Sequence, residues 1–211
     1  MLFKSKLHLV SALTIAVLLF LSFSGNHPAG NSGAPGDGIC SNCHGGSGGG
    51  FDGSIDISGL PSVVEPGTVY NITMTLNVSQ GSPIRGGFQV VSLLDANDNQ
   101  AGDWFNNGGG SSLIVSGGRE YFGHSPAQNF GGGSSISWTC DWVPPSVSDD
   151  VTFYAAGNLA NGSGSSGDKI VTNTLTVTVE PAVPLDITFS NVQDVSCFGE
   201  EDGSALASAS G

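Results

Sequence analysis

The chain has 211 residues, a length that suits one sandwich-sized domain with additional segments. It carries 18 acidic against 5 basic residues and a formal net charge of −13. Such a surface repels phosphate backbones, which argues against a nucleic-acid-binding protein and suits a basic partner or solubility outside the cell.

The N-terminus is typical of a secretory signal peptide over residues 1–24. Lys4 and Lys6 precede an apolar run over residues 9–23, and Ser22 and Ser24 are small residues at the −3 and −1 positions of a cut after residue 24. An uncleaved membrane anchor is the alternative. Cleavage would leave three basic and 18 acidic residues, a net charge of −15. We therefore expect a secreted or cell-surface protein.

Residues 25–50 form a segment rich in glycine, serine, proline and asparagine, in which Ile39 is the only large aliphatic side chain. A segment of this composition has little with which to build a core. It contains the sequence CSNCH, from Cys40 to His44. C-x-x-C-H is the attachment signature of c-type haem, in which two thiols add across the porphyrin vinyl groups and the adjacent histidine becomes the proximal iron ligand.

Three other interpretations of Cys40 and Cys43 compete with one covalently attached haem c. A zinc site needs a second ligand pair, and the remaining cysteines, Cys140 and Cys197, are isolated. A thioredoxin-like dithiol needs a βαβ context, which the sequence lacks. A small structural disulfide in an exported loop stays open. An export signal agrees with haem, because c-type haem is attached outside the cytoplasmic membrane.

From residue 51 the pattern changes to short strands separated by turn residues. Apolar and polar residues alternate over residues 69–78, over residues 136–142 and, with threonine, over residues 174–179. Alternation with period two predicts half-buried strands. Several such strands over about 130 residues, without a convincing helical period, predict an all-β fold, an antiparallel β-sandwich spanning residues 51–180.

The mature chain offers few candidates for a sixth haem ligand. Met74 alternates onto the apolar face of its predicted strand, which favours a core residue. His27 lies in the glycine-rich segment and His124 follows a predicted strand. By chemistry alone these two histidines are comparable.

The end of the chain begins a further segment over residues 181–211. The sequence PAVP at Pro181–Pro184 is typical of a stiff linker, and a new strand is predicted to start near Asp186. Because a strand pair without a third strand is rarely stable alone, we expect these residues to be the truncated start of a second module.

Several stretches in order resemble one exported bacterial family. The sequence SGAPGDGICSNCHGG is followed by GGREYFGHS, then SWTCDWVPP, then VTFYAAGNLANGSGSSGDKI. Together they resemble, over roughly residues 31–180, the choice-of-anchor V proteins, in which a CxxCH lead precedes a sandwich similar to the Reeler domain. The resemblance implies a Reeler-like sandwich behind the haem-binding segment. A histidine at the position of His124 belongs to that pattern, so the resemblance favours His124 over His27 as the haem contact.

The tail resembles a different family. The sequence SNVQDVSCFGEEDGSALASASG is similar to the start of a SprB-type repeat of large surface adhesins. This resemblance implies a longer surface protein whose sorting signal lies beyond Gly211.

These patterns predict an exported monohaem protein that transfers electrons or senses redox state, with His44 as proximal ligand, His124 as distal ligand and an unknown, basic redox partner. The alternative is a surface adhesion or matrix-binding module in which the Cys40–Cys43 pair is structural. No Ser-His-Asp arrangement, paired acids in a cleft or phosphate-binding loop stands out in the sequence. Enzymatic activity is therefore not expected.

Overall fold

The computed structural model describes residues 27–45, 48–180 and 186–210. The predicted signal peptide and the predicted linker Pro181–Pro184 lie outside these ranges. The chain divides into two compact units, Met1–Glu180 and Pro181–Gly211, which are described separately. Within the described ranges the only helical segments are two short 3-10 turns, η2 (Cys40–Asn42) and η3 (Gly48–Gly50), and neither is long enough to cross a membrane.

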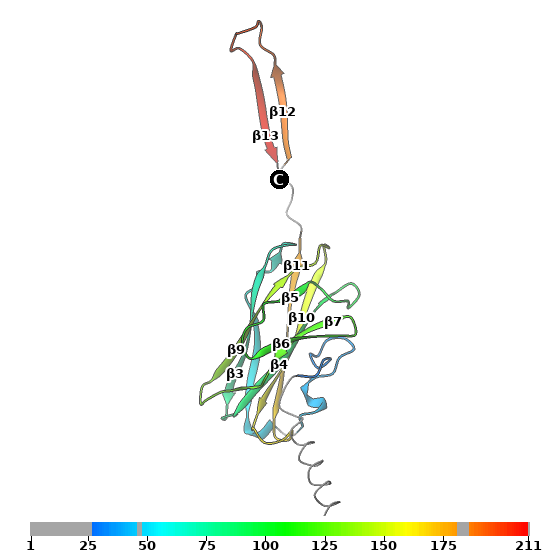
Figure 1. Cartoon of the computed structure of the whole chain (residues 1–211), viewed down its shortest axis with the longest axis vertical. Helices are drawn as coiled ribbons and strands as arrows, with labels where there is room; N and C mark the ends of the chain where they lie inside the picture. The colour runs from blue at the N-terminus through cyan, green and yellow to red at the C-terminus, as the bar shows by residue number, and fades with distance from the viewer. Residues whose placement is uncertain (1–26, 46–47, 181–185, 211) are drawn as a thin grey trace, which may run out of the picture. The chain divides into compact units, whose positions relative to one another are not determined.

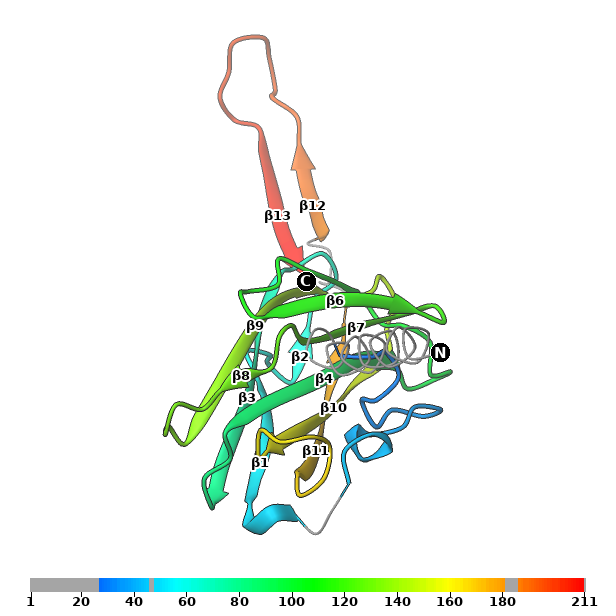
Figure 2. The same cartoon turned by 60° about the horizontal axis from the view of Figure 1, so that its bottom comes forward.

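The first unit is a sandwich of two β-sheets, as Figures 1 and 2 show. One sheet has the strand order β1-β3-β9-β5 and is antiparallel throughout. Its strands are β1 (Asp52–Ser58), β3 (Tyr70–Gln80), β9 (Ser135–Val143) and β5 (Asp103–Phe105).

The other sheet has seven strands in the order β2-β11-β10-β4-β7-β6, with β8 paired to β4. Only the short β2–β11 pair is parallel. The strands are β2 (Val63–Val64), β4 (Arg85–Leu94), β6 (Ser111–Ser116), β7 (Arg119–His124), β8 (Gln128–Asn129), β10 (Asp150–Ala160) and β11 (Lys169–Val179). The prediction of an all-β antiparallel sandwich is confirmed.

The core lies between the two sheets and follows the alternation of the sequence. On β3 and β9, Met74 faces Trp138 in register, and both are almost fully buried, 0% and 2% exposed. Met74 is therefore a core residue, as predicted, and Trp142 is buried in the same core. Aromatic rings pack against one another around these strands in tilted, edge-on and stacked pairs, which are favourable arrangements for rings in contact. The rings are those of Phe88, Trp104, Phe122, Trp138, Trp142 and Phe153.

Strand β4 is buried on both faces, which is unusual for a half-exposed antiparallel sheet. Phe88 and Val90 point into the sandwich core, whereas Val91 and Leu93 belong to a second apolar cluster on the outer face of the seven-stranded sheet. This second cluster includes Ala34 of the glycine-rich segment. The segment 27–45 therefore covers the outer face, although its composition predicted little that could join a core.

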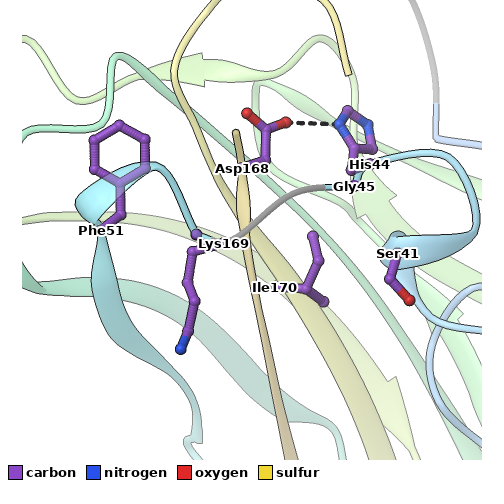
Figure 3. A pocket seen from close by; sticks show the side chains of 8 residues that line it. Ser41, His44, Gly45, Phe51, Asp168, Lys169 and Ile170 are labelled. Carbon is purple, nitrogen blue, oxygen red and sulfur yellow. Dashed lines mark hydrogen bonds and ion pairs between the residues drawn. The ribbon is translucent and has the colours of Figure 1, made fainter. Parts of the chain in front are cut away.

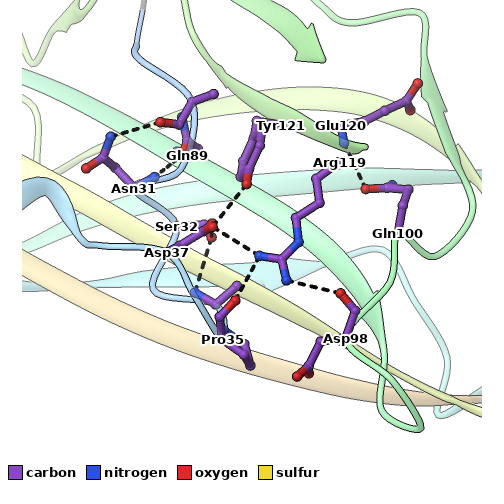
Figure 4. A network of polar contacts seen from close by, with 12 residues as sticks. Asn31, Ser32, Pro35, Asp37, Gln89, Asp98, Gln100, Arg119, Glu120 and Tyr121 are labelled. Atoms are coloured by element: carbon purple, nitrogen blue, oxygen red, sulfur yellow. Dashed lines mark hydrogen bonds and ion pairs between the residues drawn. The ribbon is translucent and has the colours of Figure 1, made fainter. Parts of the chain in front are cut away.

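Polar contacts hold the glycine-rich segment in place (Figure 4). The Asp37 carboxylate accepts hydrogen bonds from Ser32 Oγ at 2.7 Å and from Tyr121 OH at 3.0 Å, and it pairs with Arg119 Nη1 at 3.0 Å. Arg119 also donates to the Pro35 carbonyl at 2.9 Å. Because both partners of the ion pair are largely buried, this network anchors the segment more firmly than an exposed pair would.

The second unit contains one antiparallel pair, β12 (Asp186–Gln193) and β13 (Ser204–Ser210). The predicted strand near Asp186 is therefore present. All residues of both strands are exposed.

Candidate cofactor site

The CSNCH sequence forms a tight turn. Ile39 is extended, η2 begins at Cys40, and the backbone nitrogens of Cys43 and His44 both donate to the Cys40 carbonyl, at 3.2 and 2.9 Å. The turn thus brings the backbone of His44 back to Cys40. The thiols of Cys40 and Cys43 are free, the first half-buried and the second exposed.

The imidazole of His44 contacts a buried carboxylate (Figure 3). Its Nδ1 atom lies 2.7 Å from Oδ2 of Asp168, whose side chain is 0% exposed, while the His44 side chain is 37% exposed. Asp168 also accepts a hydrogen bond from Asn158 Nδ2 at 3.1 Å and one from the backbone nitrogen of Asn161 at 3.1 Å. Because a carboxylate oxygen accepts, His44 Nδ1 is the donor, and in the neutral imidazole this leaves the Nε2 lone pair for another partner.

The backbone after His44 is fixed to the loop that carries Asp168. Gly45 donates to the Ser165 carbonyl at 2.7 Å, and Gly167 donates to the Gly45 carbonyl at 2.8 Å. Both bonds fall within three residues of Asp168 in the sequence, so the approach of imidazole to carboxylate is set by the backbone as well as by the side chains.

His124 ends strand β7, and its ring lies over Gly87 of the neighbouring β4. A Cβ atom at Gly87 would come within 2.7 Å of the ring, so glycine makes room for it. The Nδ1 atom of His124 is 2.9 Å from the backbone nitrogen of Phe88 and 3.0 Å from its carbonyl oxygen. Burial lowers the pKa of His124, the Phe88 carbonyl opposes this, and the charge of the nearby His44 lowers it further.

His27 is buried, 3% exposed, and its ring lies over Gly123, where a Cβ atom would meet it at 2.5 Å. The ring centroids of His27 and His124 are 5.8 Å apart. Burial, followed by the charge of His124, lowers the pKa of His27 to about 4, although the backbone of Ser112 opposes the shift. Within the described part of the chain, His27 Nε2 nevertheless has no hydrogen bond of ordinary geometry.

The structure therefore places His27, His44 and His124 on one face of the seven-stranded sheet. Gly87, which lies beneath His124 on β4, pairs in register with Asn158 on β10, and the Asn158 amide in turn binds the carboxylate that contacts His44. The sequence singled out the three histidines but missed Asp168. Asp168 lies in the sequence GSGSSGDKI, where no local pattern marks it as a partner of His44.

A cavity of about 370 Å³ adjoins His44 (Figure 3). Its wall combines apolar side chains with that of Lys169, one of the few cations in the chain. Lys169 Nζ pairs with Asp52 at 3.2 Å. The lining residues are Ser41, His44, Gly45, Gly48, Phe51, Asp168, Lys169 and Ile170.

Among residues 27–45, 48–180 and 186–210, no three His, Cys, Asp or Glu side chains converge in a way that could hold a metal ion by themselves. A haem iron needs fewer protein ligands than a bare metal ion, because the porphyrin supplies the equatorial nitrogens and the chain supplies only axial ligands. The donor set that fits a haem is therefore Cys40 and Cys43 for attachment and a histidine with a free Nε2 for the iron.

No family model matches the chain, and no curated protein matches it. Among solved structures, it is similar to a human F-spondin reeler domain (fragment 2), with 17% identity, a TM-score of 0.42, and coverage of 65% of this chain and 96% of that one. The Reelin-N domain of F-spondin has 18% identity, a TM-score of 0.38, and coverage of 67% and 88%. A cohesin module from Clostridium perfringens has 11% identity, a TM-score of 0.43, and coverage of 63% and 99%. Reeler domains are thus among the structures similar to this chain, and these likenesses concern the fold alone.

Proposed function

We propose that the chain is an exported c-type haem module that transfers electrons or senses redox state at the cell surface. One haem would be held by Cys40 and Cys43, with His44 as proximal and His124 as distal ligand. The observation that carries this proposal is the 2.7 Å contact between His44 Nδ1 and the buried Asp168 carboxylate. Histidines that bind metals commonly donate the other ring N–H to a carboxylate in this way.

The chemistry of attachment also fits the turn. Each thiol would add across one vinyl group, with sulfur bonding one carbon and the thiol hydrogen passing to the other, so that the addition consumes no oxidant or reductant. Both thiols are free, and His44 follows Cys43 directly. When bound, the haem supplies a one-electron redox centre, while the protein supplies its ligands and surroundings.

The surroundings of the candidate ligands favour His124 as the distal one. Met74 lies in the sandwich core, and the amide nitrogen of Gln89 lies 2.6 Å from Nδ1 of His27. A histidine whose Nδ1 accepts a hydrogen bond carries its proton on Nε2, which leaves no lone pair there for iron. His124 Nδ1 lies 2.9 Å from the Phe88 backbone N–H and 3.0 Å from the Phe88 carbonyl, so its contacts are compatible with either tautomer, including the one with a free Nε2.

The negative charge of the chain favours a basic redox partner. With a formal net charge of −13, the protein would attract a basic redox partner and repel nucleic acid. Complementary charge mainly accelerates the encounter, so a fast electron-transfer reaction should slow as salt screens it.

The proposal is tested by the absorbance of the full chain, exported from cells that carry a working system for c-type haem attachment. We expect a c-type Soret band and α band that survive acid–acetone extraction and shift on reduction. The variant with Cys40→Ala and Cys43→Ala, exported alongside, should be colourless after extraction. A colourless wild-type chain would refute the proposal.

A second candidate is an adhesion or matrix-binding module. It is supported by the β12–β13 unit, in which large apolar side chains, among them Phe189 and Leu206, are exposed. An isolated two-stranded pair is marginal by itself, so such side chains suit packing against another surface. In this case the Cys40–Cys43 pair would be a structural disulfide. Thiol labelling of the exported chain under denaturing conditions would then detect two thiols that react only after reduction, whereas cysteines bonded to haem would not react even then.

A further inference from the structure

Asp168 directly precedes strand β11 and has no role in the chemistry of haem attachment. We infer that Asp168 is a positioning residue that holds His44 as the tautomer with its proton on Nδ1, and so keeps the Nε2 lone pair available to a metal centre. The assignment of the tautomer stands on the contacts of the chain alone. Its consequence for iron rests on the proposed function.

The hydrogen bonds accepted by the Asp168 carboxylate determine which nitrogen of His44 carries the proton. Three donors converge on the carboxylate: Asn161 N–H on Oδ1, and Asn158 Nδ2 and His44 Nδ1 on Oδ2. A carboxylate offers only acceptors, so the imidazole must present N–H to it. The His44–Asp168 distance of 2.7 Å is in the range of a charge-assisted hydrogen bond.

The burial of Asp168 and the backbone hydrogen bonds of Gly45 keep His44 in this orientation. The Asp168 side chain is fully shielded from solvent. Water therefore does not compete for its oxygens, and a hydrogen bond made there is stronger than the same bond at the surface. The hydrogen bonds of Gly45 to the 165–167 loop keep the two groups in register, so His44 cannot easily turn its other nitrogen toward Asp168.

The substitution Asp168→Asn would reverse the tautomer preference of His44 with little change in the shape of the side chain at position 168. The introduced amide oxygen would accept from the fixed Asn161 N–H, which directs the introduced NH₂ group toward Asn158 and His44. The Asn158 side chain can rotate its amide so that Oδ1 accepts from the introduced NH₂ group. This rotation breaks no hydrogen bond of Oδ1, because that atom is buried without a hydrogen-bond partner among the described residues. His44 Nδ1 would then become an acceptor, and the proton would move to Nε2. The same kind of substitution in a Ser-His-Asp triad leaves the geometry intact but selects the wrong tautomer.

The first measurement needs no haem. In the full chain with Cys40→Ala and Cys43→Ala, ¹⁵N NMR of the imidazole nitrogens, assigned with a His44→Gln variant, should show His44 protonated on Nδ1. Adding Asp168→Asn should move the proton to Nε2. Asp103→Asn, which removes one exposed carboxylate elsewhere, should leave the His44 tautomer unchanged. A wild-type His44 protonated on Nε2 would overturn the inference, even if the Asp168→Asn chain fails to fold.

The second measurement uses the haem-loaded chain and reads the reduction potential. A carboxylate that accepts the Nδ1 proton makes the imidazole a better electron donor and stabilises oxidised iron. Asp168→Asn should therefore favour reduction by about tenfold, a rise of about 59 mV for one electron, whereas Asp103→Asn should not. An unchanged potential in Asp168→Asn would contradict the inference. A colourless wild-type chain whose His44 is protonated on Nδ1 would refute the proposed function and leave the role of Asp168 intact.

Discussion

The side-chain amide of Gln89 donates a hydrogen bond to Nδ1 of His27 at 2.6 Å. The orientation of this amide is fixed, because its oxygen accepts from the backbone nitrogen of Asn31 at 2.6 Å and its nitrogen also donates to the Pro28 carbonyl at 2.7 Å. His27 is therefore held neutral, with its proton on Nε2, in a buried position beside His124. A hydrogen-bonded histidine of this kind anchors the glycine-rich segment to strand β4.

This environment predicts that acid destabilises the fold before the carboxylates titrate. The unfolded chain binds a proton at His27 near pH 6.5, whereas the folded chain does so only near pH 4. Since the folded pKa is the lower one, protons favour the unfolded state, and stability falls as the pH drops from about 6.5 to about 4. At roughly 1.4 kcal/mol per pKa unit, His27 accounts for about 3 kcal/mol of this loss. The lowered pKa of His124 acts in the same direction.

Denaturant unfolding of the haem-free Cys40→Ala, Cys43→Ala chain at a series of pH values measures this effect. A His27→Gln variant, whose side-chain oxygen can accept from Gln89, should show a shallower decline over the same pH window. A wild-type profile that is flat between about pH 6.5 and 4 would show that His27 is not held neutral.

The two candidate distal ligands should respond differently to substitution. In the haem-loaded chain, His124→Ala should turn the iron high-spin or open it to added carbon monoxide or cyanide, while the haem stays covalently attached. His27→Ala should destabilise the fold and leave the spectrum low-spin. If only His27→Ala changes the spin state, His27 is the ligand. If neither does, neither histidine is the distal ligand.

Gly87→Ala tests the same ligand without removing its imidazole. The added methyl group would come within 2.7 Å of the His124 ring and displace it, so the spectrum should move toward that of His124→Ala. Gly109→Ala is the matched control, because no atom of the described residues lies within 4 Å of its Cβ position. Spectra of Gly87→Ala and Gly109→Ala that both match wild type would argue against His124 as the ligand.

The tryptophans of strand β9 should be essential to the sandwich core. Trp138 and Trp142 are both buried between the sheets, as the alternation predicted. Replacing either by alanine should cost about 3–5 kcal/mol of unfolding free energy. Thr139→Ala, at an exposed position between them, should stay within about 0.5 kcal/mol. Denaturant unfolding that shows losses below about 1 kcal/mol for both tryptophans would contradict their place in the core.

The Asp37–Arg119 pair should control how firmly the glycine-rich segment is attached. Arg119→Met keeps most of the side-chain stem but leaves the largely buried Asp37 without its cation, at an expected cost of about 1–3 kcal/mol. Hydrogen exchange of residues 30–40 should accelerate, because this segment packs on the sheet through few apolar contacts. Arg85→Met, at an exposed position on β4, should leave that exchange unchanged.

Strand patterns could be predicted from the sequence because burial on one face leaves a period of two. Strand β9 extends one residue beyond each end of its predicted segment, and β11 starts five residues earlier than predicted. Strand β3 starts one residue later and ends two residues later than predicted. The docking of the glycine-rich segment could not be predicted, because it depends on hydrogen bonds between residues such as Asp37 and Arg119, 82 positions apart, which leave no local pattern. The contact between Asp168 and His44 could not be predicted for the same reason, since the two residues are 124 positions apart.

The central claim is that Cys40 and Cys43 carry a haem whose iron is bound by His44. The most direct test is the mass of the peptide containing residues 40–44, obtained by proteolysis of the exported full chain after acid–acetone extraction. The account predicts that this peptide carries the added mass of one haem through both cysteines, and that the Cys40→Ala, Cys43→Ala chain does not. A wild-type peptide with unmodified thiols, or with a Cys40–Cys43 disulfide, from cells that attach haem to other proteins would contradict it.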